Sequence, residues 1–339
     1  MTRRMWAAAI PVGLLVLIIV PAARAEAGQK GVTIMKTSYK GWPNCYRVTN
    51  GTIELIATQD IGPRIIRLGF VGGDNMFGEM DDQAGKTGGD EWRIYGGHRL
   101  WHSPEAKPRS YFPDNFPIEV KEGPNSLTLI QPTEKTTGIR KTIEVTMQPD
   151  RNQVVVVHRL RNDNLWPVEL APWALSVMAK TGLAIIPQPA PVPHEQALLP
   201  ARPLAQWTYT DMSDPRWRWG AKYITLRQDP GIAAPQKIGV GNHENWIACA
   251  VKGNLFVKTF QYQEGATYPD FGCTIEVFTN ADILEVETLG PMTRLEPGQT
   301  AEYTENWFLF KGVSVANDDA SIDGVALPKV KEALRAAAG

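Results

Sequence analysis

Tyr268-Pro-Asp-Phe-Gly-Cys-Thr-Ile-Glu-Val-Phe-Thr-Asn280, followed by Ile283-Leu-Glu-Val-Glu-Thr-Leu-Gly-Pro291, contains two short stretches in which polar or acidic residues alternate with apolar ones. Successive side chains of a β-strand point to opposite faces, so Glu285 and Glu287 are predicted to share one face of the second stretch. Leu284 and Val286 share the other face. Both stretches are therefore predicted to be strands of an antiparallel sheet with an apolar inner face.

The outer face of these two strands allows two interpretations. In the first strand Glu276 shares a face with Thr274 and Phe278, so three carboxylates, Glu276, Glu285 and Glu287, can lie on one surface. Such a surface can form the floor of a binding site. It can also be an ordinary solvated face of an antiparallel sheet, which the spacing alone favours.

Residues 26–315 are predicted to form one all-β domain, and residues 316–339 a C-terminal tail. Short runs rich in β-branched and aromatic residues alternate with turn signals, which is typical of a sandwich or barrel. Six prolines in residues 187–203 exclude a central strand and predict a long crossing loop. Pro328 and the helix formers Lys329–Ala338 predict a short helix that packs on the outside of a sheet. The other predicted strands are Thr52–Thr58, Arg64–Phe70, Leu127–Gln131, Ile139–Met147, Gln153–Leu160, Val168–Met178, Tyr223–Leu226, Trp246–Val251, Leu255–Gln261 and Thr304–Phe310.

Residues 1–25 have the features of an export signal. Arg3 and Arg4 precede an apolar run that extends to about Ala23, and Ala23-Arg24-Ala25 has the small-x-small form of a cleavage site. We therefore expect a periplasmic or secreted protein that has no membrane segment once the signal is removed. An uncleaved anchor is the alternative, because the apolar run approaches the length of a membrane span.

Charge and cysteine content narrow the classes of partner. The chain has 35 basic and 36 acidic residues and no basic stripe, so a nucleic-acid partner is not expected. No glycine-rich phosphate loop is present, and no cofactor is expected.

Cys249 and Cys273 could pair, but we expect these two and Cys45 to be small core residues. The oligomeric state cannot be inferred.

A second segment, Glu91-Trp-Arg-Ile-Tyr-Gly-Gly-His-Arg-Leu-Trp-His-Ser-Pro-Glu105, concentrates residues that bind ligands. His98, His102 and Glu105 fall within eight residues, and Arg99 and Trp101 lie among them. The glycine pair and the proline argue against a helix, so a helical His-x₃-His metal site is the minor interpretation and no metal is expected. We expect a loop or strand end on a polar cleft, with histidines that exchange protons near neutral pH and tryptophans that stack on a sugar. A packed loop whose histidines only satisfy backbone groups is the alternative.

Two further residues are candidates for ligand contacts. Asp114 closely follows this segment and is expected on the same rim. Trp173 alternates with Leu175 and Val177, so it can face either the core or the cleft.

Three segments resemble the galactose mutarotase-like, or aldose 1-epimerase-like, superfamily, and more closely an uncharacterised group of exported bacterial proteins within it. Glu54–Leu68, with its Gly-Pro-Arg-Ile turn, is similar to the opening hairpin of that fold. Ile94–Trp101 resembles the Gly-Gly segment of the hexose-phosphate epimerase branch. Glu287-Thr-Leu-Gly-Pro291 before Leu295-Glu-Pro-Gly298 resembles the end of the fold, where a catalytic glutamate precedes the last strand.

The resemblance implies a β-supersandwich with a sugar-binding groove. It also implies a mutarotase mechanism, in which a carboxylate deprotonates the anomeric hydroxyl while a histidine protonates the ring oxygen. Glu287 matches the base, with Glu285 as the alternative, and His98 or His102 is expected to be the acid. The stretch Asn164–Met178, where mutarotases carry a histidine, has none here.

The sequence therefore predicts an exported carbohydrate-active protein, and a mutarotase or epimerase if it is an enzyme. The expected catalytic residues are Glu287, His98 and His102. The expected sugar contacts are Arg99, Trp101, Glu105, Asp114, Trp173, Glu276 and Glu285. A carbohydrate-binding protein without activity and a glycosidase with paired carboxylates are the alternatives, because fold does not determine activity.

Overall fold

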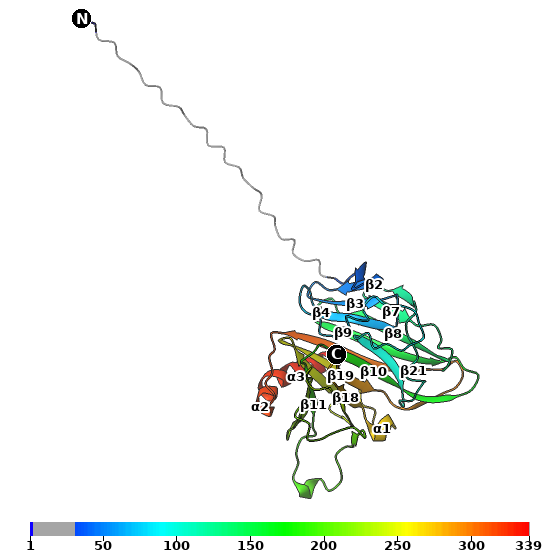
Figure 1. The fold of residues 1–339 in the computed structure, drawn as a ribbon. Coiled ribbons are helices and arrows are strands. Elements are labelled where there is room, and N and C mark those ends of the chain that lie inside the picture. Colours follow the sequence, from blue (N-terminus) through cyan, green and yellow to red (C-terminus); the bar gives the residue numbers. More distant parts are fainter. Residues whose placement is uncertain (3–30, 339) are drawn as a thin grey trace.

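The computed structural model describes residues 1–2 and 31–338 of the chain. Most of the predicted export signal lies outside the described residues. The all-β prediction is confirmed, because the described chain forms an 11-stranded and a 10-stranded sheet with antiparallel strand pairs (Figure 1). Within the described ranges, no helix has the length and apolar character needed to cross a membrane.

The larger sheet carries the strands that matter for function. In spatial order its strands are β1 (Thr33–Tyr39), β2 (Trp42–Thr49), β3 (Ile53–Thr58), β4 (Arg64–Phe70), β5 (His98–Ser103), β10 (Val168–Met178), β19 (Leu284–Leu289), β18 (Ile275–Thr279), β15 (Gln236–Val240) and β12 (Leu204–Gln206), and β20 (Thr293–Leu295) pairs with β10.

The smaller sheet packs against one face of the larger sheet. Its order is β13 (Trp217–Trp219), β14 (Tyr223–Arg227), β11 (Leu183–Pro187), β16 (Trp246–Val251), β17 (Asn254–Thr259), β21 (Thr300–Lys311), β9 (Gln153–Asn162), β8 (Ile139–Met147), β7 (Ser126–Ile130) and β6 (Glu119–Glu122). The short helical elements are η1 (His194–Gln196), α1 (Pro269–Gly272), α2 (Asp319–Ser321), η2 (Ile322–Ala326) and α3 (Leu327–Ala338).

The alternation in β18 and β19 places their side chains as the sequence predicts. Leu284 and Val286 pack in the main core between the sheets. Glu285 and Glu287 point to the other face of the larger sheet, where Glu276 lies directly opposite Glu287 in the strand register. The three carboxylate residues are only 0–6 % exposed, so the interpretation of a solvated face is wrong.

The segment around His98 differs most from the sequence prediction. It forms β5, a strand inside the larger sheet that pairs with β4 and β10, instead of a loop or strand end. The fully buried Arg64 stabilises the chain that leads into it. This guanidinium donates hydrogen bonds to the carbonyl oxygens of Ile94 at 2.8 Å and Gly96 at 2.9 Å, so the β5 register depends on it.

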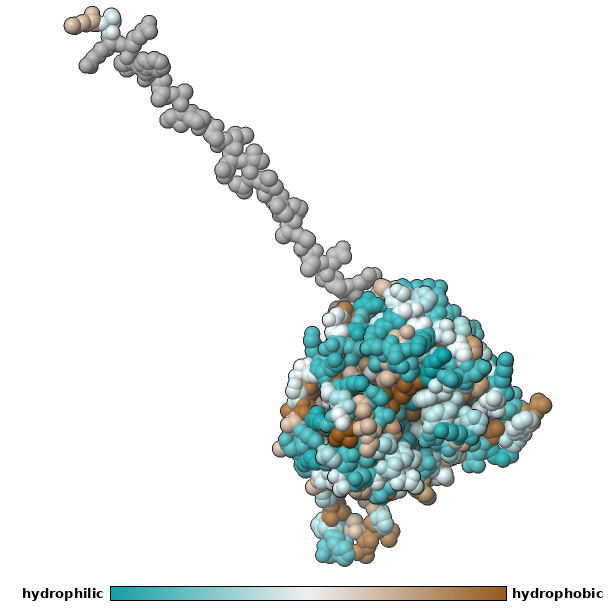
Figure 2. Space-filling view, in the orientation of Figure 1, coloured by the Kyte–Doolittle hydropathy of each residue, from teal (hydrophilic) through white to brown (hydrophobic). Residues whose placement is uncertain are grey.

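The tail behaves as predicted, and so does the proline-rich stretch except at Pro187, which ends the inner strand β11. Residues 188–203 are mostly exposed and project from the sheets as a loop, whose far end carries both hydrophilic and hydrophobic residues (Figures 1 and 2). The helix α3 packs Val330 and Ala333 against the outer face of the smaller sheet. All three cysteines are buried and free.

Candidate functional site

A cavity of about 570 Å³ lies on the outer face of the larger sheet. Side chains of β5, β10, β19 and β18 form its floor, together with Lys237 of β15. The neighbouring side chains on these strands, such as Leu100, Ala174 and Val286, point into the main core instead. The strand alternation therefore assigns one set of residues to the core and the next set to the cavity.

At this cavity Lys237 forms a buried cluster with Glu276 and Glu287, which we call the lysine–carboxylate cluster. The Lys237 Nζ lies 2.7 Å from the Glu276 Oε2 and 3.5 Å from the Glu287 Oε2. The indole Nε1 of Trp173 donates a hydrogen bond of 2.7 Å to the same Oε2 of Glu287. The other oxygen, Glu287 Oε1, is buried and has no hydrogen-bond partner in the described chain, so it is available to a ligand.

The cluster can hold an exchangeable proton. Burial raises the pKa of the Glu276 carboxyl well above its ordinary value, and it also raises the pKa of Glu287, although the charge of Lys237 opposes both shifts. Burial alone would lower the pKa of Lys237, but the negative charges of Glu276 and Glu287 have the larger effect and raise it. The ammonium therefore stays charged while the two carboxyl groups compete for a proton, which is the property that acid–base catalysis requires.

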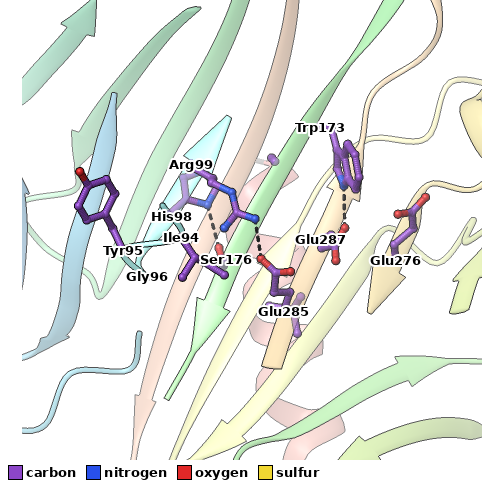
Figure 3. Close-up of polar contacts among 12 residues, drawn as sticks. Ile94, Tyr95, Gly96, His98, Arg99, Trp173, Ser176, Glu276, Glu285 and Glu287 are labelled. Carbon is purple, nitrogen blue, oxygen red and sulfur yellow. Dashed lines mark hydrogen bonds and ion pairs between the residues drawn. The ribbon is translucent and has the colours of Figure 1, made fainter. Parts of the chain in front are cut away.

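A second ion pair forms another part of the cavity wall. The Arg99 Nη2 lies 2.9 Å from the Glu285 Oε1 (Figure 3). The Arg99 Cζ lies 4.8 Å from the ring centre of Trp101. The Arg99 Nε and Nη1 are buried donors for which the described residues supply no acceptor. Because buried donors normally have partners, these two nitrogens are suited to the hydroxyl groups of a ligand.

Aromatic rings line the remaining wall. The rings of Trp101 and Trp173 are 5.3 Å apart, and those of Trp92 and Tyr111 are 5.2 Å apart. Tyr111 also donates a hydrogen bond to Glu105, which lines the same cavity. Aromatic rings next to hydrogen-bonding groups are suited to a ligand with both apolar and hydroxyl-bearing faces, such as a sugar.

Neither histidine of β5 lies on this cavity. His98 points between the two sheets, where its Nδ1 is 2.8 Å from the Ser176 Oγ and its Nε2 is 2.8 Å from the His158 Nε2. Burial lowers the pKa of His98 well below its ordinary value, and burial lowers the pKa of His158 to about 4. The structure therefore does not bring His98 and Glu287 together around one ligand, and the expected proton exchange near neutral pH does not fit this buried position.

His102 and Asp114 also lie away from the cavity. The His102 Nε2 is 3.8 Å from the Glu134 Oε2, and burial lowers the pKa of the imidazole. Asp114 pairs with Arg64 at 2.6 Å and lines a neighbouring cavity of about 620 Å³. The other expected sugar contacts, which line the main cavity or its lysine–carboxylate cluster, are Arg99, Trp101, Glu105, Trp173, Glu276 and Glu285.

Sequence reasoning missed Lys237 and Tyr209, which both line the main cavity. Lys237 lies on β15, which pairs with β18, so that Lys237 faces Phe278 in the register. The short strand Gln236–Val240 contains a glycine and no run of β-branched residues, so its sequence gave little signal. Only the pairing of strands that are distant in sequence places this lysine beside the carboxylates.

His98 and His158 belong to a polar group between the sheets that also contains Glu305. Their potential ligand atoms lie within 4.8 Å of one another. However, the Lys258 Nζ lies 2.9 Å from the Glu305 Oε1, and Trp307 donates a hydrogen bond of 2.8 Å to its Oε2. A metal ion would have to compete with this ammonium, so the residues fit a hydrogen-bonded network better than a metal centre.

No family model matches the sequence, and the search of curated proteins found no match. Several solved structures have a similar fold. A TPR-domain containing protein from Parabacteroides distasonis gives a TM-score of 0.52 at 12% identity over 78% of this chain, which spans 47% of that protein. The Slr1438 protein from Synechocystis gives 0.50 at 11% identity, covering 82% of this chain and 99% of that one.

Proteins described as galactose mutarotase-like are also among the similar structures. One from Lactobacillus casei gives a TM-score of 0.48 at 12% identity, covering 78% of this chain and all of that one (100%). At such identities the similarity concerns the fold alone, so the function has to be argued from the cavity itself.

Proposed function

We propose that the protein binds a carbohydrate in the main cavity and interconverts its anomers by acid–base catalysis. The lysine–carboxylate cluster carries this proposal, because Glu287 and Lys237 line the cavity beside Trp101 and Trp173. Glu276 pairs with Lys237 and lies opposite Glu287 in the strand register, and burial raises the pKa of both carboxyl groups. The export signal expected at residues 1–25 would place this activity in the periplasm or outside the cell.

The chemistry requires one base and one acid close together. Glu287, whose Oε1 is unpartnered, takes the proton of the anomeric hydroxyl, and Glu276 gives a proton to the ring oxygen as the ring C–O bond breaks. The carbonyl that forms at C1 can then rotate, and reversed proton transfers close the ring as the other anomer. Both sugar oxygens are bonded to the same carbon, so neighbouring carboxyl groups on one floor can serve them together.

This assignment moves the acid role from the histidines to the cluster. Lys237 and the Trp173 indole keep the two carboxyl groups in place, while Arg99 offers two free donors to ring hydroxyls. A glycosidase needs carboxylates on the two sides of a scissile bond, whereas Glu276 and Glu287 are cross-strand neighbours on one floor. Anomer interconversion therefore fits the geometry better than glycoside cleavage.

Carbohydrate binding without catalysis is the second candidate. It is favoured by the fact that no histidine is among the described residues that line the main cavity. In this case the same aromatic wall and the Arg99 donors would bind the sugar, and the cluster would only accept hydrogen bonds from it.

Proton NMR of freshly dissolved α-glucose and α-galactose tests the proposal. We expect the protein to accelerate anomer interconversion, and Glu287→Gln to reduce this acceleration by about a hundredfold or more while sugar-induced changes in tryptophan fluorescence persist. Glu302→Gln, at a carboxylate that is half exposed and pairs with Arg159, is the control and should leave the rate unchanged. An unchanged rate in Glu287→Gln would refute the base assignment, and binding without acceleration by the native protein would support the second candidate.

A further inference from the structure

The turn α1 has an unusual backbone for its sequence. Asp270 has φ 52° and ψ 51°, and Phe271 has φ 67° and ψ 21°, so two consecutive non-glycine residues adopt the left-handed conformation. A bulky side chain is strained there, and such strain is concentrated at functional sites. The backbone of this turn thus holds a phenylalanine in a position that the chain would not adopt without a cost.

The side chain of Phe271 is 90% exposed. Tyr268, Tyr262 and His243 form a stack beside it: the ring centres of Tyr262 and Tyr268 are 5.5 Å apart, and those of His243 and Tyr262 are 4.0 Å apart. Phe271 and these three rings line an open cavity of about 740 Å³. The strained turn therefore adds an exposed aromatic face to a surface that is already aromatic.

This aromatic surface begins one residue along the chain from a smaller cavity that shares part of its lining with the main cavity. Asp270, the neighbour of Phe271, lines a smaller cavity of about 320 Å³ together with Trp173, Tyr111 and Glu105. The last three residues also line the main cavity. A chain of sugar units that begins over the lysine–carboxylate cluster can thus pass Trp173 and Asp270 and reach Phe271.

We propose that Phe271 and the ring stack form an outer subsite that binds a further sugar unit of an oligosaccharide whose terminal unit lies in the main cavity. This inference rests on the proposed function. Phe271 stacks on the apolar face of the outer sugar, and the nearby Arg202 and His243 side chains bind its hydroxyl groups.

Isothermal titration calorimetry with Phe271→Ala tests the inference. The probes are glucose and galactose, compared with maltotriose, cellotriose and β-1,4-galactotriose. At least one trisaccharide should bind roughly threefold to tenfold more tightly than its monosaccharide, and Phe271→Ala should abolish that gain without changing the monosaccharide affinity. Because the ring is largely exposed, the variant should fold.

Two further variants keep the outcome interpretable. Phe271→Gly removes the ring and also relieves the left-handed strain, so it should lose the trisaccharide gain while its thermal stability rises. Leu165→Ala, which removes an apolar side chain that is 89% exposed at another turn, should keep the gain. If monosaccharides bind but no trisaccharide binds more tightly, or if Phe271→Ala keeps the gain, the outer subsite is refuted and the proposed function stands. If none of the sugars binds, both are refuted.

Discussion

At the scale of single residues, Lys237 determines the electrostatics of the site. Its ammonium contacts two buried carboxylates and lies 4.6 Å from the ring centres of both Trp173 and Trp207. Its side chain is only 5% exposed. Without this charge Glu276 and Glu287 would repel each other in a poorly solvated place, so the lysine allows two carboxylates to share one floor.

Replacing this lysine by methionine therefore has a pH-dependent effect on stability. In Lys237→Met both carboxyl groups favour their protonated forms, which raises their folded-state pKa values further. Stability is then retained at low pH and lost as the pH rises through those values. We expect a loss of about 3 kcal/mol in the free energy of unfolding at pH 8 and a smaller loss at pH 5, measured by urea denaturation.

Lys222→Met is the control for that experiment, because Lys222 is 55% exposed in its ion pair with Asp323. Loss of a solvent-exposed pair of this kind should change the free energy of unfolding much less than loss of the buried lysine does. An equal loss at both pH values in Lys237→Met would show that the two carboxyl groups stay ionised, contrary to the cluster as described.

At the scale of elements, β5 depends on the glycines that precede it. Gly97 has φ +70°, and a Cβ atom there would lie 2.3 Å from the carbonyl oxygen of Ile65. Gly88 has nearly the same φ, +69°, but nothing lies within 4 Å of its Cβ position. A comparison of substitutions at these two glycines therefore separates the free-energy cost of a left-handed backbone from the cost of a collision with β4.

Substituting alanine at each position measures both costs. Gly88→Ala should lower the free energy of unfolding by about 1 kcal/mol, the cost of a left-handed alanine. Gly97→Ala should cost about 2 kcal/mol more, because β4 and β5 must move apart. Urea denaturation of the two variants checks this, and equal losses would mean that β4 and β5 adapt to the added methyl group without cost.

The same strands show what local sequence can predict. The alternation in β18 and β19 correctly placed Glu276, Glu285 and Glu287 on one face, because period 2 is a property of a strand itself. The histidines of β5 were misplaced because glycines and a proline flank a short strand whose position is set by pairing with β4 and β10. Once β5 is known to be a strand, the same alternation separates His98 and His102 from Arg99 and Trp101.

At the scale of the whole molecule, the sandwich places an acidic cavity on one face of a nearly neutral chain. Among the described residues, five carboxylate residues line the main cavity against two cationic ones, and both cations already form ion pairs. The acidic residues are Asp82, Glu105, Asp282, Glu285 and Glu287, and the cationic residues are Arg99 and Lys237. Because a cavity with low-dielectric walls concentrates its field, its charge selects among ligands of equal size.

This charge distribution predicts the order of sugar affinities. Glucose should bind more tightly than glucuronate or glucose 6-phosphate, because the anionic sugars meet uncompensated carboxylates as they enter. The difference should shrink when salt is raised from 0.01 M to 1 M, since the screening length falls from about 30 Å to about 3 Å. Competition binding followed by tryptophan fluorescence measures both effects. Glu105→Gln should reduce the difference in affinity between glucose and the anionic sugars, because it removes one negative charge from the wall. Glu119→Gln on the distant strand β6 should leave this difference unchanged. Tighter binding of glucose 6-phosphate than of glucose would contradict the prediction, because both cations that the described residues place in the wall already pair with carboxylates.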